Sequence, residues 1–169
     1  MIDIYSIAAS LKGIDPALAT LLISLLPVIE PRYALVIGVT VYGMSVLNAF
    51  ILSIIGLIFL SIILASAVEK ILESGKHGLL SRVSLVRRLV LWIEESSLGR
   101  ASPLIEKYGW VGLVLFIAIP LPLTGVYTGT IAGLLLGIKR KKLLYALLLG
   151  GFISILITGL SVGVISMWW

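Results

Sequence analysis

The chain has 169 residues, of which 60% are hydrophobic and 12% charged, with a net charge of +5 and a mean hydropathy of +1.19. A soluble domain is typically ~45–50% apolar and ~25% charged. The composition therefore predicts an integral membrane protein and excludes a cytosolic enzyme or a nucleic-acid binder. With no cysteine and a single histidine, His77, the sequence offers neither a disulfide framework nor a multi-histidine metal site, so we expect no metal and no cofactor.

The first half of the chain contains two charge-free runs, 16–29 and 33–68. The first is too short to cross a membrane, because a spanning helix needs ~20 apolar residues. The second would reach ~54 Å as one helix, so it must bend, and Gly43 to Ser45 followed by Asn48 is the natural place. We expect a hairpin or kinked segment over 16–43 and a spanning helix over 46–68, after an N-terminal segment 1–15.

The third run, 108–138, is interrupted by prolines and glycines. The residues that we expect to break its helix are Pro120, Pro122, Gly125 and Gly129. Two half-helices, 108–119 and 126–138, would form either a kinked span or a re-entrant hairpin. Basic residues are frequent in 69–107 and return in Lys139–Lys142, and the positive-inside rule requires both clusters to be cytoplasmic. This requirement favours a hairpin over 103–138, followed by a spanning helix over 143–166.

The two halves follow one plan. A shift of 94 positions pairs Tyr33 with Tyr127 and Gly56 with Gly150, and prolines mark both breaks, Pro27 and Pro31 in the first half. We therefore expect a single all-α membrane domain, 1–169, built as an inverted repeat with both termini outside. The basic cytoplasmic linker 69–102 is expected to contain an amphipathic interfacial helix over 78–98, because its apolar residues follow helical spacing.

Glu30 and Arg32 are the charged residues that lie within the apolar part of the first half. Ionisable groups at membrane depth are costly and usually mark function. Pro31 disfavours a helical conformation at Glu30, and in an extended segment both side chains would project to one side. We expect Glu30 to accept a proton or cation and Arg32 to bind an anion. The alternative is a mutually neutralised pair that fixes the turn.

The second break supplies uncharged polar groups. The candidate binding residues there are Thr124, Tyr127 and Thr128, with Thr130 nearby. Half-helix ends expose backbone groups and partial charges that suit ions or headgroups. The alternative is that these hydroxyls only satisfy their own broken backbone. We expect the two turns to meet near the membrane midplane around Glu30 and Arg32.

The segment Pro27-Val28-Ile29-Glu30-Pro31-Arg32 resembles the first signature of the small multidrug export family, and the stretch from Phe116 to Gly129 resembles its second. The likeness extends over 21–164. That family is similar to the wider DedA-like, or VTT, superfamily. It implies a transporter with two re-entrant hairpins packed against spanning helices. Relatives in that superfamily are linked to translocation of phospholipids and polyprenyl phosphates and to proton-dependent membrane homeostasis. Glu30 and Arg32 match the family's acid and arginine, whereas Pro31 and Tyr33 replace its leucine and glycine.

These observations predict a non-enzymatic transporter in the cell membrane that translocates an anionic amphiphile, such as a phospholipid or polyprenyl phosphate, in a proton-linked manner. One alternative is proton-coupled export of small cationic or drug-like compounds, which Arg32 would repel. A second alternative is a membrane scaffold that transports nothing. The expected partners are the lipid bilayer, the substrate, protons and a second copy of the chain in a homodimer, but no nucleic acid.

Overall fold

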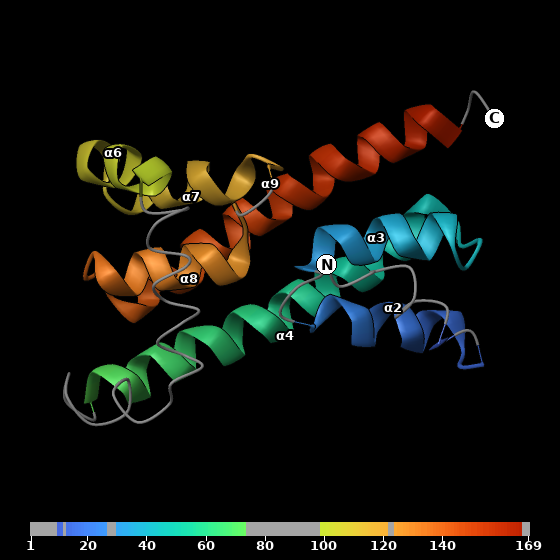
Figure 1. The fold of residues 1–169 in the computed structure, drawn as a ribbon, viewed down its shortest axis with the longest axis horizontal. Helices are drawn as coiled ribbons and strands as arrows, with labels where there is room; N and C mark the ends of the chain where they lie inside the picture. Colours follow the sequence, from blue (N-terminus) through green and yellow to red (C-terminus); the bar gives the residue numbers. More distant parts are fainter. Residues whose placement is uncertain (1–9, 12, 27–29, 74–98, 122–123, 167–169) are drawn as a thin grey trace. The chain divides into compact units, whose positions relative to one another are not determined.

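A computed structural model describes residues 10–11, 13–26, 30–73, 99–121 and 124–166. Within these residues the ordered elements are α-helices without strands, which confirms the predicted all-α class (Figure 1). The helices are α2 (Pro16–Ser24), α3 (Glu30–Thr40), α4 (Val46–Glu73), α6 (Gly99–Tyr108), α7 (Trp110–Ala118), α8 (Val126–Leu135) and α9 (Arg140–Ser166). The predicted linker helix over 78–98 lies outside the described residues.

Two helices are long and apolar enough to cross a membrane, as predicted: Val46–Ala67 within α4 and Arg140–Ile165 within α9. At 1.5 Å per residue they reach ~33 and ~39 Å, more than the ~30 Å hydrocarbon core. The start expected at 143 is wrong by three residues, because α9 begins at Arg140. Its first turn carries exposed cationic side chains whose charged ends can extend into water, so no apolar residue is needed there.

The chain divides into two compact units, Met1–Leu60 with Gly151–Trp169, and Ser61–Gly150. The first unit holds α2, α3, the N-terminal part of α4 and the C-terminal part of α9. The second holds α6, α7, α8 and the remaining parts of the two long helices. Each unit is described by itself below.

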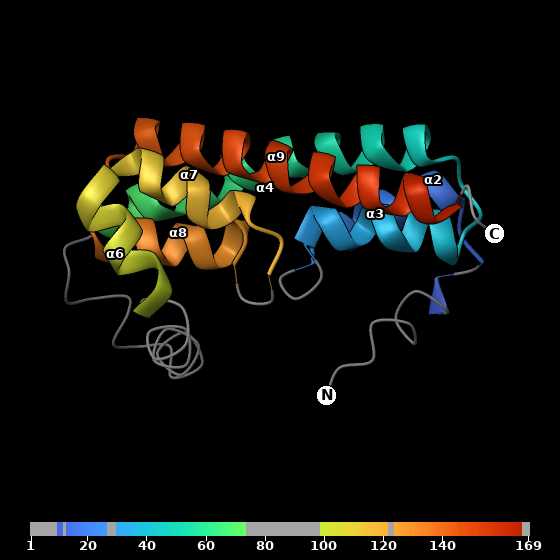
Figure 2. The same ribbon diagram turned by 90° about the horizontal axis from the view of Figure 1, so that it is seen from above.

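In the first unit, α2 and α3 lie side by side as an antiparallel helical hairpin (Figures 1 and 2). Asp15 begins α2 by accepting hydrogen bonds from the backbone N–H groups of Ala17 and Leu18, at 2.9 and 3.1 Å. The two helices bury Ile23 against Ala34 and Ile37. The core of this unit therefore begins with the contact between the two short helices.

The long helices pack closely against this hairpin through residues without large side chains. A Cβ on Gly38 of α3 would lie 3.1 Å from Cβ of Ala49 on α4, and one on Gly56 would collide with Ser24 of α2. Phe50 of α4 meets Phe152 of α9 edge to face, with ring centroids 6.2 Å apart. The first hairpin, α4 and α9 thus form one packed group.

In the second unit, α7 and α8 also fold back on one another. A Cβ on Gly129 would lie 2.6 Å from Ile117, and one on Gly133 would lie 3.1 Å from Leu113. These two contacts give one antiparallel register, since a step of four residues along α8 matches a step of four back along α7. The prediction that Gly129 breaks the helix is wrong: it lies inside α8 and permits close packing with α7.

Helix α6 was not predicted as an element of the second unit. It ends at Tyr108, and Gly109 turns the chain with a positive φ of 59° before α7 begins. A Cβ on Gly112 would collide with the backbone carbonyl of Leu104, so α6 and α7 approach at backbone distance. The half-helix expected over 108–119 is therefore shorter, and a second helix packs beside it.

The spacing of 94 residues between corresponding positions in the sequence recurs in the positions of structural features. Helix α4 begins at Val46 and α9 at Arg140, and each follows a glycine with positive φ, Gly43 at 64° and Gly137 at 69°. Gly150 repeats the role of Gly56, because a Cβ on it would lie 2.7 Å from Cβ of Ile117 in α7. In both units a long helix thus crosses the first arm of a helical hairpin at a glycine.

Candidate functional site

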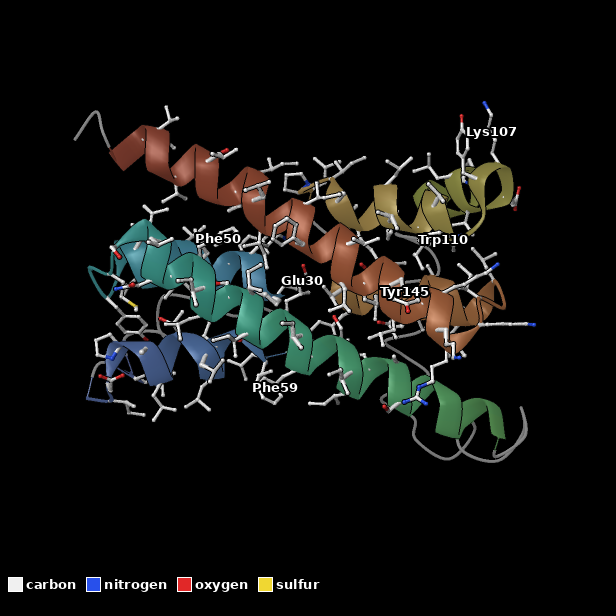
Figure 3. The ribbon with its side chains drawn as sticks, turned by 180° about the vertical axis from the view of Figure 1, so that it is seen from behind. Glu30, Phe50, Phe59, Lys107, Trp110 and Tyr145 are labelled. Atoms are coloured by element: carbon white, nitrogen blue, oxygen red, sulfur yellow. The ribbon has the colours of Figure 1, made fainter. Side chains whose placement is uncertain are left out.

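Glu30 and Arg32 form a buried ion pair at the N-terminal end of α3. Arg32 Nη2 lies 3.2 Å from Glu30 Oε2, and the two side chains are 6% and 11% exposed respectively. Figure 3 shows Glu30 at the start of its helix. Charged side chains are almost never buried to this extent unless they are paired. The pairing that the sequence allowed is therefore present in the structure.

The backbone that brings these charges together differs from the expectation. Glu30 was predicted to be extended, but its φ of +55° places it in the left-handed region. Pro31 disfavours the right-handed helical conformation at the residue before it, and a left-handed residue avoids that clash as an extended one does. Pro31 itself occupies the first turn of α3, where its missing N–H removes no intrahelical hydrogen bond. The break thus precedes Pro31 rather than occurring at it.

Tyr33 contributes a third group to this site. The guanidinium carbon of Arg32 lies 5.0 Å from the centroid of the Tyr33 ring, within the range of a cation–π contact. Sequence reasoning used Tyr33 to align the two halves and to compare the first motif with the family's, but did not count it among the site residues. An aromatic residue directly after a membrane-embedded arginine is the signal that could have identified it.

In the second hairpin, a shift of 94 places Thr124 at the position of Glu30. Thr124 Oγ1 donates to the backbone carbonyls of Ile119 and Leu121, at 2.6 and 2.8 Å, and accepts from the N–H of Leu121 at 3.1 Å. One neutral hydroxyl therefore closes the break between α7 and α8. The comparison indicates that a helical hairpin of this kind does not need a charged pair at its turn.

The other hydroxyls of this turn are also used locally. Thr128 Oγ1 accepts from the N–H of Gly125 at 2.8 Å at the start of α8, and Thr130 Oγ1 donates to the carbonyl of Val126 at 2.7 Å. Tyr127 is half-buried in the first turn of α8. These bonds favour the structural interpretation of the threonines over headgroup binding.

The predicted site residues fall into two groups. Glu30 and Arg32 belong to the first unit, whereas Thr124, Tyr127 and Thr128 belong to the second. Of the predicted break residues, Pro120 follows the end of α7 and Gly125 caps α8, as expected. Pro27 and Pro122 lie outside the described residues. Within each unit the site residues that the structure describes are close in sequence and in space.

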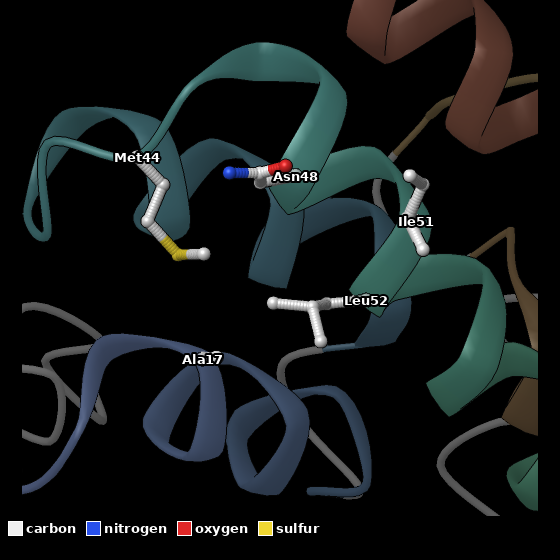
Figure 4. A pocket seen from close by; sticks show the side chains of 5 residues that line it. All are labelled: Ala17, Met44, Asn48, Ile51 and Leu52. Carbon is white, nitrogen blue, oxygen red and sulfur yellow. The ribbon is translucent and has the colours of Figure 1, made fainter.

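Two recesses lie in the first unit, at some distance from the ion pair along the chain. One of ≈ 240 Å³ is lined by Ala17, Met44, Asn48, Ile51 and Leu52, with the Asn48 amide at its edge (Figure 4). The other, of ≈ 350 Å³, is lined by Val46, Leu47, Phe50, Leu156, Gly159 and Leu160. Neither contains a charged group. The described residues contain no cluster of histidine, aspartate and glutamate that could hold a metal ion.

The fold and site define a helical protein with two helices long and apolar enough to cross a membrane and a buried ion pair at the start of a short helix. Residues 30–157 match the protein family described as "Putative small multi-drug export protein". This match covers most of the chain, so the protein belongs to the small multi-drug export family, as the motifs at both breaks indicated. Searches of curated proteins and of solved structures found no match.

Proposed function

We propose that this protein is a membrane transporter that moves an amphiphile with an anionic headgroup, linked to protons, and that Glu30 and Arg32 form its polar centre. The observation that carries the proposal is their ion pair, buried in a segment covered by the family match. A buried ion pair is weak support for stability, since apolar residues of similar volume often serve as well. The second turn supports the same conclusion, because Thr124 and Thr128 bond to its backbone through neutral hydroxyls.

The chemistry of the pair suits an anion. Arg32 carries a permanent charge and a planar fork of donors, and the partial positive charge at the start of α3 acts in the same direction. In the structure, the carboxylate of Glu30 lies beside Arg32 at the start of α3, where its negative charge compensates both positive charges. An anionic headgroup that engaged Arg32 would weaken its attraction for Glu30 and favour uptake of a proton by the carboxylate. Headgroup binding and proton binding would then be coupled at one site.

The short helices support a re-entrant arrangement of both hairpins. Their arms have 9 and 11 residues in the first hairpin and 9 and 10 in the second, or ~14–17 Å each, about half of a ~30 Å hydrocarbon core. The antiparallel register of α7 and α8 brings Lys107 and Lys139 to the same end of the second hairpin. The positive-inside rule then makes that end cytoplasmic. We extend the proposal to an inverted repeat with both termini outside.

The apolar recess between α4 and α9 supports an amphiphilic substrate. Gly159, in its wall, lies against Leu35, one turn after Arg32 on α3. A hydrocarbon chain fits such a lining. Since α4 and α9 are the two helices of spanning length among the described residues, we also propose that a second copy of the chain completes the pathway.

The test is headgroup translocation of labelled anionic lipids, including a polyprenyl phosphate, in proteoliposomes at several pH values. Wild type is compared with Glu30→Gln and Arg32→Ala, and with Glu106→Gln as a matched control at an exposed glutamate of α6. We expect folded Glu30→Gln to lose the pH dependence and folded Arg32→Ala to lose translocation. Wild type that moves none of these lipids at any pH would refute the proposal.

The family description favours one alternative, export of drug-like compounds by the same proton-linked site. Arg32 repels cations, so a cationic drug would require Glu30 to dominate the site. Substrate-dependent proton movement with cationic dyes, unaffected by anionic lipid, would support this alternative. A protein whose folded Glu30→Gln variant differs only in partner binding would instead be a scaffold.

A further inference from the structure

The second unit has a strongly basic end, where α6 stops and α9 begins. Lys107 is the last residue but one of α6, and residues 139–142 are four consecutive cations at the start of α9. All of these side chains are exposed, and Glu106 is the only acidic side chain that the structure describes in this unit. The start of a helix disfavours cations, so the cluster does not help α9 to form.

Helices α7 and α9 run in the same direction from this basic end. Gly133 of α8 packs against both, since a Cβ on it would lie 3.1 Å from Leu113 of α7 and 2.7 Å from Leu143 of α9. Further along both helices, a Cβ on Gly150 of α9 would lie 2.7 Å from Ile117 of α7. The first turns of α7 and α9 therefore lie at the same end of the unit.

The exposed side chains that follow the basic turn of α9 form one stripe. Lys142, Tyr145 and Leu149 are exposed, and their spacing of three and four residues places them within about 60° of one another around the helix axis. The centre of this stripe lies about 100° from Gly150, the residue at which α9 contacts α7. A cation, an aromatic ring and an aliphatic side chain thus follow one another away from the basic end.

Helix α7 carries a matching apolar stripe. Val111 and Leu115 are exposed and lie one turn apart, about 90–130° from the contact that Val114 and Ile117 make with Gly150. Seen from the basic end, this stripe lies clockwise of the direction to α9, whereas the stripe of α9 lies anticlockwise of the direction to α7. Because the two helices are parallel, both stripes face the same side of the pair. Together they form the α7–α9 face, which consists of Val111, Leu115, Tyr145 and Leu149.

The end of α6 adds a second cation and a second tyrosine beside this face. Gly109 turns the chain from α6 into α7, so Lys107 and Tyr108 lie next to the first turn of α7, near Trp110 (Figure 3). Lys107 Nζ lies 5.2 Å from the centroid of the exposed Tyr108 ring. Tyrosine rings favour the boundary between lipid and water. The basic end of the α7–α9 face therefore has the residues of a membrane interface.

Arg140 is directed away from the α7–α9 face, although it belongs to the same basic run. Its Nη2 donates a hydrogen bond to Oγ of Ser66 in α4, at 3.2 Å. Around the axis of α9, Arg140 lies about 160° from Lys142. Arg140 thus connects α9 to α4, whereas Lys142 lies above the α7–α9 face. The two residues carry the same charge on opposite sides of one helix.

We propose that the α7–α9 face binds an anionic phospholipid of the surrounding bilayer. Its phosphate is bound by Lys107 and Lys142, and its hydrocarbon chains lie along Val111, Leu115 and Leu149. The order of cation, tyrosine and aliphatic side chain along the face matches the order of phosphate, glycerol and hydrocarbon in such a lipid. Basic clusters next to spanning helices attract anionic headgroups, and ammonium groups form charge-assisted hydrogen bonds with phosphate oxygens. The lipid is a bound partner and not the transported substrate, so the inference goes beyond the proposed function.

The experiment titrates the purified full chain in detergent and measures bound lipid by native mass spectrometry. The probes are phosphatidylglycerol, phosphatidylcholine with the same acyl chains, and glycerol phosphate, which has no chains. The variants are Lys107→Gln and Lys142→Gln, with Arg140→Gln as the control that removes the same charge from the other side of α9. We expect wild type to bind phosphatidylglycerol more tightly than phosphatidylcholine. Each lysine variant should bind phosphatidylglycerol about 5-fold more weakly and phosphatidylcholine unchanged, and the control should change by less than about 2-fold.

Three results would overturn this inference. Equal affinity of wild type for the two lipids would mean that the cations serve only to orient the chain in the membrane. Equal weakening in all three charge variants would mean that net charge attracts the lipid and that the α7–α9 face does not. Glycerol phosphate that binds as tightly as phosphatidylglycerol would mean that the apolar stripes contribute nothing.

The outcome is separable from that of the transport proposal. In the double variant Glu30→Gln/Arg32→Gln, we expect the lysine-dependent part of phosphatidylglycerol binding to persist. Its loss in that variant would assign the lipid to the ion pair and overturn the inference. A wild-type protein that translocates no anionic lipid but binds phosphatidylglycerol through Lys107 and Lys142 would refute the transport proposal and leave this one standing.

Discussion

Removing one charge of the Glu30–Arg32 pair should destabilise the protein far more than removing both. The pair is held at 3.2 Å with side chains 6% and 11% exposed, so the remaining charge would be left buried without its partner. Breaking such a pair costs about 3–5 kcal/mol, whereas replacing both members by well-packed apolar residues of similar volume is often neutral or stabilising. We expect Glu30→Gln and Arg32→Gln each to lose about 3–5 kcal/mol and the double variant to lose at most about 1 kcal/mol.

The assay is reversible unfolding in mixed detergent micelles, combined with translocation in proteoliposomes for each folded variant. The double variant decides between the two interpretations of the pair, because it restores the fold without restoring the charges. If the pair serves transport, this variant is stable and inactive; if the pair only fixes the hairpin, it is stable and active. Losses in the two single variants that simply add in the double variant would refute the reasoning, since coupled residues must deviate from additivity.

Three further predictions concern packing, topology and the second turn. Gly150→Ala should lose about 1–3 kcal/mol in the same unfolding assay, because its Cβ would lie 2.7 Å from Ile117. Gly163→Ala should not lose stability in this way, because a Cβ added there would meet no neighbouring atom within 4 Å. Because the chain has no cysteine, Lys107→Cys and Lys141→Cys are clean reporters, and a membrane-impermeant thiol reagent should label both from the cytoplasmic side; labelling from opposite sides would contradict a re-entrant hairpin. Thr124→Val should lose about 1–3 kcal/mol and keep wild-type translocation of anionic lipids, since its hydroxyl is engaged by backbone; a selective loss of translocation in the folded variant would return it to the binding site.

The parts of the fold that were predicted depend on hydropathy and on chain-breaking residues. A charge-free run longer than the bilayer is thick must bend, and the chain turns at Gly43 before α4 begins. The runs after the two breaks became the helices of spanning length. These features follow from the length of a helix per residue and from the need to satisfy backbone groups in lipid, both of which are properties of local sequence.

The candidate site was predicted in part. Glu30 and Arg32 were singled out because they are charges in an apolar segment, and their ion pair is the arrangement that the sequence offered as the alternative to separate proton and anion binding. The conformation at Glu30 was not predicted, because Pro31 excludes one backbone region and leaves two. Gly129 is a residue type that often interrupts a helix, but here it allows close packing of α8 on α7, since its missing side chain makes room for Ile117. In an apolar sequence a glycine can either interrupt a helix or allow close helix packing, and only the position of the neighbouring helix decides between the two.

The sequence by itself determined that the chain is helical, which two helices are long and apolar enough to cross a membrane, that the chain belongs to the small multi-drug export family, and which two charges lie in an apolar segment of its first half. Only the tertiary structure decided which hydroxyls are used and which remain available. Thr124 and Ser53 are alike in sequence, each a hydroxyl in an apolar segment, yet one closes a turn and the other is buried without a hydrogen bond in the part of the chain that the structure describes. That difference arises because a hydroxyl's partner is set by the helices packed around it, and their register is a property of the folded chain.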